Sequence, residues 1–211
     1  LAVARALDDL LPGLTSVGGR GWSRRRAASP RGLYIHGGVG RGKTMLMDMF
    51  HDALVATTPQ APPFRLHFHD FMVLAQDAIH VAREAGETDP IGAAADSLAS
   101  RGRVMCFDEM EVRDIADAMI LSRLFTAMFE RGVTVVATSN RHADELYKNG
   151  LHRDRFLPFI ALLKARCDVM EIAAGADWRA SMLATLPAWY TPDDAAAAAA
   201  LDAAFISLAG G

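Results

Sequence analysis

A glycine-rich run that ends in a lysine and a threonine is the segment of this sequence with the clearest chemistry. Its residues are Gly37, Gly38, Val39, Gly40, Arg41, Gly42, Lys43 and Thr44. Glycines allow backbone angles that turn successive N–H groups toward an anion, a lysine reaches the terminal phosphates, and a threonine hydroxyl binds magnesium. An apolar segment precedes the run and a helical pattern follows it, which is the context of a phosphate-binding loop. We therefore predict that residues 37–44 bind the phosphates of ATP together with Mg²⁺.

Two adjacent carboxylates follow a later apolar segment, residues 104–107. At the carboxyl end of a strand, Asp108 would face the phosphate loop and hold magnesium, directly or through water. Glu109 would then orient or deprotonate an attacking water. The alternative is an acidic helix cap. A base for water favours hydrolysis of the nucleotide over phosphoryl transfer to a small acceptor.

Polar residues also end the next apolar segment, at Thr138, Ser139 and Asn140. A side chain here can hydrogen-bond the attacking water or the γ-phosphate. The alternative is a turn or helix cap before residues 142–144.

Two arginines, Arg153 and Arg155, stand between the fourth and fifth apolar segments. An arginine presented at the edge of a domain can complete the site of a neighbouring subunit and stabilise charge in the transition state. The alternative is a surface arginine paired with Asp154.

The elements that must position these residues alternate between strand and helix patterns. We predict strands at 33–36, 64–68, 103–107, 133–138 and 167–172, and helices at 1–14, 43–55, 73–84 and 115–129, the first ended by Pro12 and Gly13. Continuous apolar strands separated by helices indicate a parallel sheet covered on both faces. The expected organisation is an N-terminal helix and linker (1–32), one α/β core (33–175) and an alanine-rich helical tail (176–211).

Composition excludes several classes of protein. With 211 residues, 51% hydrophobic and 22% charged, the chain is suited to a globular domain with its own core. A net charge of -3 provides no overall basic field for nucleic acid. One local basic run, Arg24–Arg26, is either a solvated loop flank or a contact for nucleic acid. Cys106 and Cys167 lie in apolar segments and are expected to be buried free thiols. No apolar stretch reaches the roughly 18 residues of a membrane span.

Taken together, the four motifs resemble those of AAA+ ATPases, and longer segments resemble a narrower family. GLYIHGGVGRGKTMLMDMF, HFHDFM, CFDEMEVRDIADAMILSRLF and TSNRHADELYKNGLHRDRFLPFI are similar to the family of ZapE and the AFG-type ATPases, over about residues 1–190. The resemblance implies a three-layer sandwich whose five parallel strands follow the order 5-1-4-3-2. It also implies self-association into a ring or other oligomer, with ATP bound between subunits, and a lid that residues 176–211 would represent in shortened form.

The resemblance also implies roles for individual residues. It places Walker A at 37–44, Walker B at Asp108 and Glu109, sensor 1 at Asn140, and an arginine finger at Arg155 or else Arg153. Arg155 is preferred because it precedes Phe156 in an Arg-Phe pair. Arg179 is a candidate for the arginine of the lid.

The activity implied is that of an ATPase that remodels a protein partner in cell division, with FtsZ as the candidate partner. The implied location is the bacterial cytoplasm, at the division site or peripherally on the inner face of the membrane. One alternative is a helicase-loader-like ATPase that uses residues 20–31 on DNA, which the net charge and the family resemblance disfavour. Another is a small-molecule kinase, which would need an acceptor pocket and a lid. His67 and His69 alternate like a metal pair but lack further ligands nearby in sequence, so structural roles are expected for them.

Overall fold

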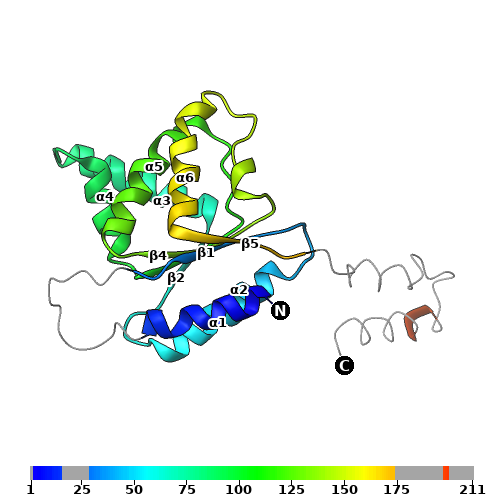
Figure 1. The fold of residues 1–211 in the computed structure, drawn as a ribbon. Coiled ribbons are helices and arrows are strands. Elements are labelled where there is room, and N and C mark those ends of the chain that lie inside the picture. Colours follow the sequence, from blue (N-terminus) through cyan, green and yellow to red (C-terminus); the bar gives the residue numbers. More distant parts are fainter. Residues whose placement is uncertain (1, 16–28, 174–196, 200–211) are drawn as a thin grey trace. The chain divides into compact units, whose positions relative to one another are not determined.

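A five-stranded parallel sheet forms the centre of the molecule (Figure 1). The computed structural model describes residues 2–15, 29–173 and 197–199. The strands are β1 (Gly32–His36), β2 (Phe64–His67), β3 (Val104–Asp108), β4 (Thr134–Ser139) and β5 (Cys167–Glu171). Their order is β2-β3-β4-β1-β5, with every neighbouring pair parallel. This is the expected order 5-1-4-3-2 counted from the other edge, so the predicted α/β fold is confirmed.

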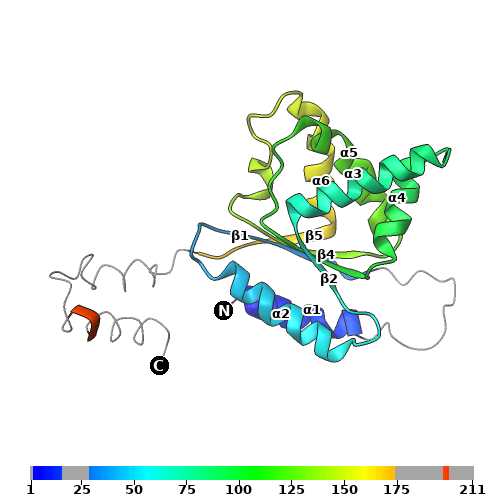
Figure 2. The same cartoon turned by 180° about the vertical axis from the view of Figure 1, so that it is seen from behind.

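Helices cover both faces of the sheet, and Figure 2 shows the same three layers from behind. One face carries α1 (Ala2–Thr15) and α2 (Lys43–Thr57). The other carries α3 (Phe68–Glu84), α4 (Pro90–Ala99), α5 (Ile115–Glu130) and α6 (Leu157–Arg166). Two short 3₁₀ turns, η2 (Ala143–Glu145) and η3 (Arg153–Arg155), lie between β4 and α6.

The three central strands, β1, β3 and β4, are mostly apolar because both of their faces are buried, whereas the edge strands β2 and β5 are partly exposed. Side chains alternate between the faces of a strand. In β1, Tyr34 packs in the larger core with α3 to α6, whereas Leu33 and Ile35 pack in the smaller core with α1 and α2. Phenylalanines in tilted and edge-to-face contact occupy the centre of the larger core, where the ring centroid of Phe107 lies 4.6 Å from that of Phe71.

The two helix boundaries that bear most on the sequence prediction are the end of α1 and the start of α3. Helix α1 continues through Pro12 to Thr15. Pro12 is exposed, so the carbonyl left without its N–H partner, that of exposed Asp8, can be solvated. Helix α3 begins at Phe68, five residues before the predicted start, because Phe68, Phe71 and Met72 are buried at helical spacing. The histidine at 69 therefore lies in a helix and not in a strand.

Helix α4, like α6, is an element that the sequence prediction omitted. Its buried residues, Ile91, Ala94, Ala95 and Leu98, follow helical spacing, and Pro90 stands in its first turn. Small side chains make this pattern faint in the sequence, yet they let α4 pack closely between α3 and α5.

The chain divides into two compact units, Leu1–Ala173 and Ala174–Gly211. In the second unit, residues 197–199 are described and are helical. The remainder of the expected tail, with Arg179, and the basic run Arg24–Arg26 lie outside the described residues. Within the part of the chain that the structure describes, no helix combines the length and the apolar character that a membrane crossing requires.

Candidate nucleotide-binding site

Three of the predicted motifs meet at the carboxyl edge of the sheet, because β4 lies between β1 and β3. Hydrogen bonds join them directly. The amide of Gly37, after β1, donates to the carbonyl of Ser139 in β4 (3.2 Å). The amides of Glu109 and Met110, after β3, donate to the hydroxyl (3.2 Å) and the carbonyl (2.7 Å) of Thr138. The hydroxyl of Ser139 donates in turn to the carbonyl of Met110 (2.8 Å).

The glycine-rich loop between β1 and α2 holds the ammonium group of Lys43. Gly40 and Gly42 have positive φ angles of 78° and 80°, which glycine adopts without strain. Lys43 is only 9% exposed, and its Nζ donates to the carbonyls of Gly37 (2.8 Å) and Gly38 (2.7 Å). Burial lowers the pKa of Lys43, and the charge of Arg41 lowers it further. The two hydrogen bonds place the ammonium group at the loop. The N-terminal turn of α2, which carries a partial positive charge, is beside it.

Arg41 connects this loop to the end of β5. Its Nη1 donates to the carbonyl of Ile172 (3.1 Å), whose own amide donates to His36 at the end of β1 (2.7 Å). A Cβ atom at Gly37 would come within 2.9 Å of the Ile172 carbonyl, so the loop approaches β5 too closely for a side chain there. Val39, in the same loop, is 81% exposed.

Asp108 is buried at the end of β3 and uses one of its two carboxylate oxygens. Its Oδ2 accepts a hydrogen bond from Nε of Arg65 (2.7 Å), and its Oδ1 is buried without a partner among the described residues. An unpartnered buried carboxylate oxygen is costly unless a ligand satisfies it, and oxygen is the ligand that Mg²⁺ prefers. Thr44 lies exposed in the first turn of α2. These residues thus fit a magnesium ion held by one carboxylate, one hydroxyl and nucleotide phosphates.

Glu109 has a backbone conformation that is rare for a residue with a side chain. Its φ angle is 55°, in the left-handed region. The hydrogen bond from its amide to Thr138 helps to hold this strained geometry. The carboxylate is exposed at the mouth of the site, where it can contact water.

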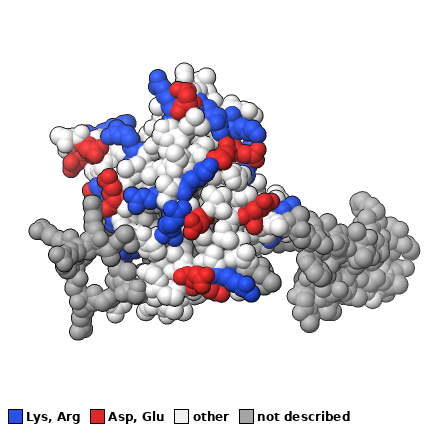
Figure 3. All heavy atoms as spheres, in the orientation of Figure 1, with Lys and Arg blue, Asp and Glu red and all other residues white. Residues whose placement is uncertain are grey.

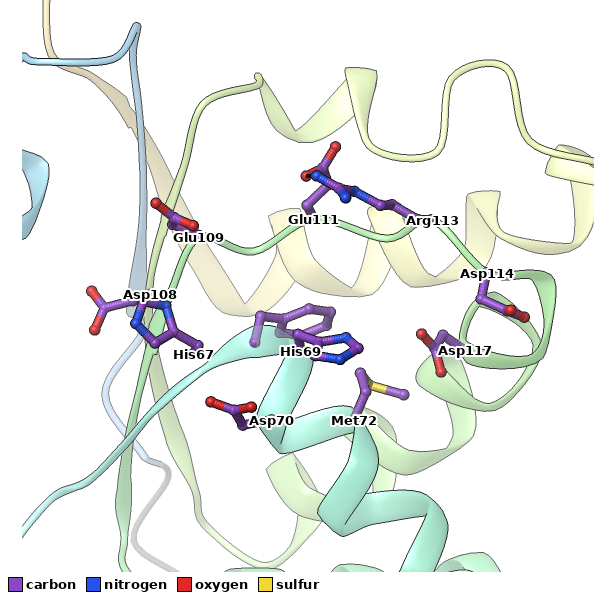
Figure 4. A pocket seen from close by; sticks show the side chains of 11 residues that line it. His67, His69, Asp70, Met72, Asp108, Glu109, Glu111, Arg113, Asp114 and Asp117 are labelled. Carbon is purple, nitrogen blue, oxygen red and sulfur yellow. Dashed lines mark hydrogen bonds and ion pairs between the residues drawn. The ribbon is translucent and has the colours of Figure 1, made fainter.

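A pocket of about 490 Å³ opens beside Glu109, between the ends of β2 and β3 and the start of α5 (Figure 4). His67 and His69 line it together with Asp114 and Asp117. Burial raises the pKa of Asp117, and a hydrogen bond from Gln76 acts in the opposite direction. The described residues contain no group of three or more His, Cys, Asp or Glu arranged to hold a metal ion, so the two histidines lack a third ligand there.

Asn140 is exposed directly after β4, and its side chain has no hydrogen-bond partner among the described residues. The alternative role for residues 138–140 was a turn or a helix cap. In the structure Ser139 and His142 accept the hydrogen bonds of this turn and cap, and Asn140 does not. The hydroxyl of Ser139 accepts from the amide of Arg141 (3.2 Å), and Nδ1 of His142 accepts from the amide of Asp144 (3.2 Å). The amide group of Asn140 therefore remains available to a ligand.

The two candidate finger arginines differ in their surroundings. Arg153 is half-buried and donates to the carbonyl of Asp144 (2.6 Å). Arg155 is exposed, with no ion pair or hydrogen bond from its guanidinium in the described region, so the alternative pairing with Asp154 is not formed. Phe156 is fully buried against Tyr147 and Phe159, and it anchors the turn that presents Arg155.

Arg65 is a residue of this site that sequence reasoning missed. Arg41 lies within the predicted loop, and only its contact with Ile172 was not predicted. Both partners of Arg65 are distant in sequence, and only the pairing of β2 with β3 brings Arg65 to Asp108. Nothing in the sequence around Arg65, which lies in an edge strand just before α3, indicates that it contacts Asp108.

The strand order, the loop after β1 and the carboxylate pair after β3 define a P-loop ATPase of the AAA+ class. Solved structures agree on the fold. Domain III of the replication initiation protein DnaA from Thermotoga maritima matches with a TM-score of 0.55 at 14% identity, covering 99% of this chain and 70% of that one. The DnaC helicase loader matches with a TM-score of 0.53 at 15% identity, covering 80% and 89%.

Within that class, the chain belongs to the AFG1-like ATPase family, whose model matches residues 5–211. The cell division protein ZapE of Escherichia coli K12 is 45% identical over 202 residues, which are 94% of this chain and 52% of ZapE. Lactation elevated protein 1 homolog B of Danio rerio is 45% identical over 159 residues, 71% of this chain and 31% of that protein. The chain thus spans about half the length, or less, of these relatives.

Proposed function

We propose that this chain binds ATP with Mg²⁺ and hydrolyses it to ADP and phosphate at the carboxyl edge of the sheet. The observation that carries the proposal is the hydrogen-bonded connection of the phosphate loop, the carboxylate pair and the end of β4. Membership of the AFG1-like ATPase family supports it.

Each polar group of this edge has a distinct part in the proposed reaction. Residues 37–42 turn amides toward the phosphates, and the Lys43 ammonium balances phosphate charge. Thr44 and Asp108 hold Mg²⁺, which supplies further charge neutralisation when bound. Glu109 orients the attacking water and accepts its proton, while Asn140 donates to that water or to the γ-phosphate.

Arg155 is proposed to act on the site of a second copy of the chain. It is exposed and unpaired in the described region, whereas Arg153 is engaged with the backbone. Its guanidinium would stabilise negative charge that develops on the γ-phosphate during hydrolysis. The proposal therefore includes self-association into a ring or other oligomer.

The work coupled to hydrolysis is proposed to be the remodelling of a protein partner in cell division, with FtsZ as the candidate, at the division site or the inner face of the membrane. The similarity to ZapE, which is a cell division protein, supports this. Nucleic acid is not favoured as the partner. Acidic and basic side chains are mixed over the face in Figure 3, and Arg31 is engaged by Asp168 and by carbonyls near the end of α6.

Replacement of Glu109 by glutamine tests the hydrolytic role. We expect Glu109→Gln to bind ATP as wild type does and to hydrolyse it about 100-fold more slowly or worse, because the base for water is lost. The measurements are equilibrium binding of a fluorescent ATP analogue and the rate of phosphate release. The ATP-trapped variant should also retain FtsZ in a pull-down with ATP and release it with ADP.

Glu111→Gln is the matched control for this test. Glu111 is two residues further on, half-exposed and paired with Arg113, and it has no part in the proposed reaction. Its phosphate release should equal that of wild type. Undiminished hydrolysis by Glu109→Gln would remove Glu109 from the mechanism, and FtsZ binding that ignores the nucleotide would count against FtsZ as the partner.

A further inference from the structure

Arg65, in edge strand β2, bridges two carboxylates on different elements. Its Nε donates to Oδ2 of Asp108 at 2.7 Å, and its Nη1 lies 2.6 Å from Oδ1 of Asp48 in α2. The side chain is 21% exposed, so the ion pairs are partly shielded from water. Charge-assisted contacts of this length are stronger than neutral hydrogen bonds.

The bridge joins the two elements that carry the proposed magnesium ligands. Asp48 stands four residues after Thr44 in α2, and residues at that spacing share one face of a helix. Asp108 ends β3. A planar guanidinium holds two acceptors in fixed directions, so Arg65 restrains the face of α2 that includes Thr44 relative to the end of β3.

The bridge also determines which oxygen of Asp108 is free. Arg65 occupies Oδ2, and Oδ1 is the buried oxygen that no described residue contacts. In Figure 4 the carboxylate of Asp108 points away from Asp114 and Asp117 at the far end of the pocket. The free oxygen therefore does not take part in that acidic cluster.

We propose that Arg65 is a positioning residue for the magnesium ion of bound ATP. It orients Asp108 so that Oδ1 accepts the ion or its water, and through Asp48 it keeps Thr44 in register with Asp108. The inference rests on the proposed binding of ATP with Mg²⁺ at this site.

The test compares nucleotide binding with and without the metal. Mg²⁺ is titrated while the binding of a fluorescent ATP analogue is measured, and the Mg²⁺ concentration that gives half of its full effect is determined. For Arg65→Met, we expect this concentration to rise on the order of 10-fold, as when a residue that orients a metal ligand is lost. Binding of the analogue in EDTA should stay at the wild-type level. A purely structural role for Arg65 would weaken both.

Arg131→Met is the matched control, because Arg131 also bridges elements through a carboxylate, Asp96 of α4, with 25% of its side chain exposed. It should leave the Mg²⁺ dependence unchanged. If circular dichroism shows that Arg65→Met is unfolded, the test uses Asp48→Asn instead. This variant removes only the ion pair between Arg65 and α2, at a side chain that is 54% exposed. It should shift the Mg²⁺ dependence in the same direction.

An unchanged Mg²⁺ dependence in the folded Arg65 variant, or in Asp48→Asn where that variant decides, overturns the inference. Tighter Mg²⁺ binding by the Arg65 variant than by wild type also overturns the inference, because Arg65 would then compete with the ion for Asp108. A wild-type chain whose nucleotide binding ignores Mg²⁺ would instead refute the proposed function itself, so the two failures are distinguishable.

Discussion

Neighbouring groups hold two charged side chains at the carboxyl edge of the sheet, while several groups of the proposed chemistry are unpaired. Lys43 is bound by two loop carbonyls, and Asp108 has one oxygen on Arg65. Groups without a hydrogen-bond or ion-pair partner in the described region include Oδ1 of Asp108 and the side chains of Glu109, Asn140 and Arg155. Leaving a buried oxygen unsatisfied costs free energy of folding, which a ligand would recover.

The two cysteines permit a prediction at the scale of single residues. Burial raises the pKa of both Cys106 and Cys167 to about 12, so the reactive thiolate is scarce at neutral pH, and both thiols are enclosed in the core. We expect neither to react rapidly with a thiol reagent at pH 8 in the folded chain, and both to react in denaturant. Colour development with a chromogenic disulfide measures this, and one thiol reacting at the free-cysteine rate in native protein would contradict it.

At the scale of elements, the site depends on close packing between strands β1 and β4. Gly32 begins β1, and a Cβ atom there would clash with the backbone carbonyl of Val135 in β4. The same pair of strands places Gly37 beside Ser139. Space at the start of β1 is therefore needed to keep the phosphate loop in register with the end of β4.

Gly32→Ala tests this packing. We expect it to lower the free energy of unfolding by about 1–3 kcal/mol, as overpacking does. Gly13→Ala is the control with the opposite sign. Gly13 lies in α1, where a Cβ would contact Pro30, among the described residues, at an ordinary 3.5 Å, so alanine should stabilise the chain by about 0.5–1 kcal/mol. Urea unfolding followed by circular dichroism measures both, and equal stability of Gly32→Ala and wild type would show that the strands can separate without penalty.

At the scale of the whole molecule, the proposed reaction would combine catalytic groups from two copies of the chain. Glu109 and Asn140 stand at the sheet edge, while Arg155 projects from the turn η3 and contacts none of the other proposed site residues in its own chain through a hydrogen bond or ion pair. Exposed Leu151 and Leu157 flank this turn. A basic group between apolar side chains is suited to an interface with a second copy.

A mixing experiment tests the shared site. Glu109→Gln and Arg155→Ala should each hydrolyse ATP slowly, and mixing them should restore part of the activity, because some sites then combine an intact glutamate with an intact arginine from the neighbour. Wild-type turnover per subunit should rise with protein concentration. The matched control is Arg153→Ala, whose arginine is engaged by Asp144, and it should retain the response to concentration. A mixture no more active than the separate variants, with wild-type turnover independent of concentration, would remove the action in trans.

The sequence alone is enough to recognise the parts whose signals are local. The glycine run before Lys43 and Thr44, the carboxylate pair after an apolar segment and the five strands are patterns of adjacent residues. The fold that they predict is confirmed. The early start of α3 and the whole of α4 were missed, because an alternating run before α3 and small side chains in α4 obscure the helical period. Helix α6 was missed as well. The roles of Glu109, Asn140 and Arg155 stay predictions until they are measured.

Only the tertiary structure decided which distant groups touch. The contact of Arg65 with Asp108 spans 43 residues and exists because β2 pairs with β3 in one register. The separation of Arg153, bound to a carbonyl, from Arg155, exposed and unpaired, likewise depends on how the turn η3 packs through Phe156. Hydrogen bonds and burial act over a few ångströms of space and not along the chain, so the phosphate loop of Gly37 to Thr44 is legible in the sequence, while the neighbours that orient its metal site are visible only in the fold.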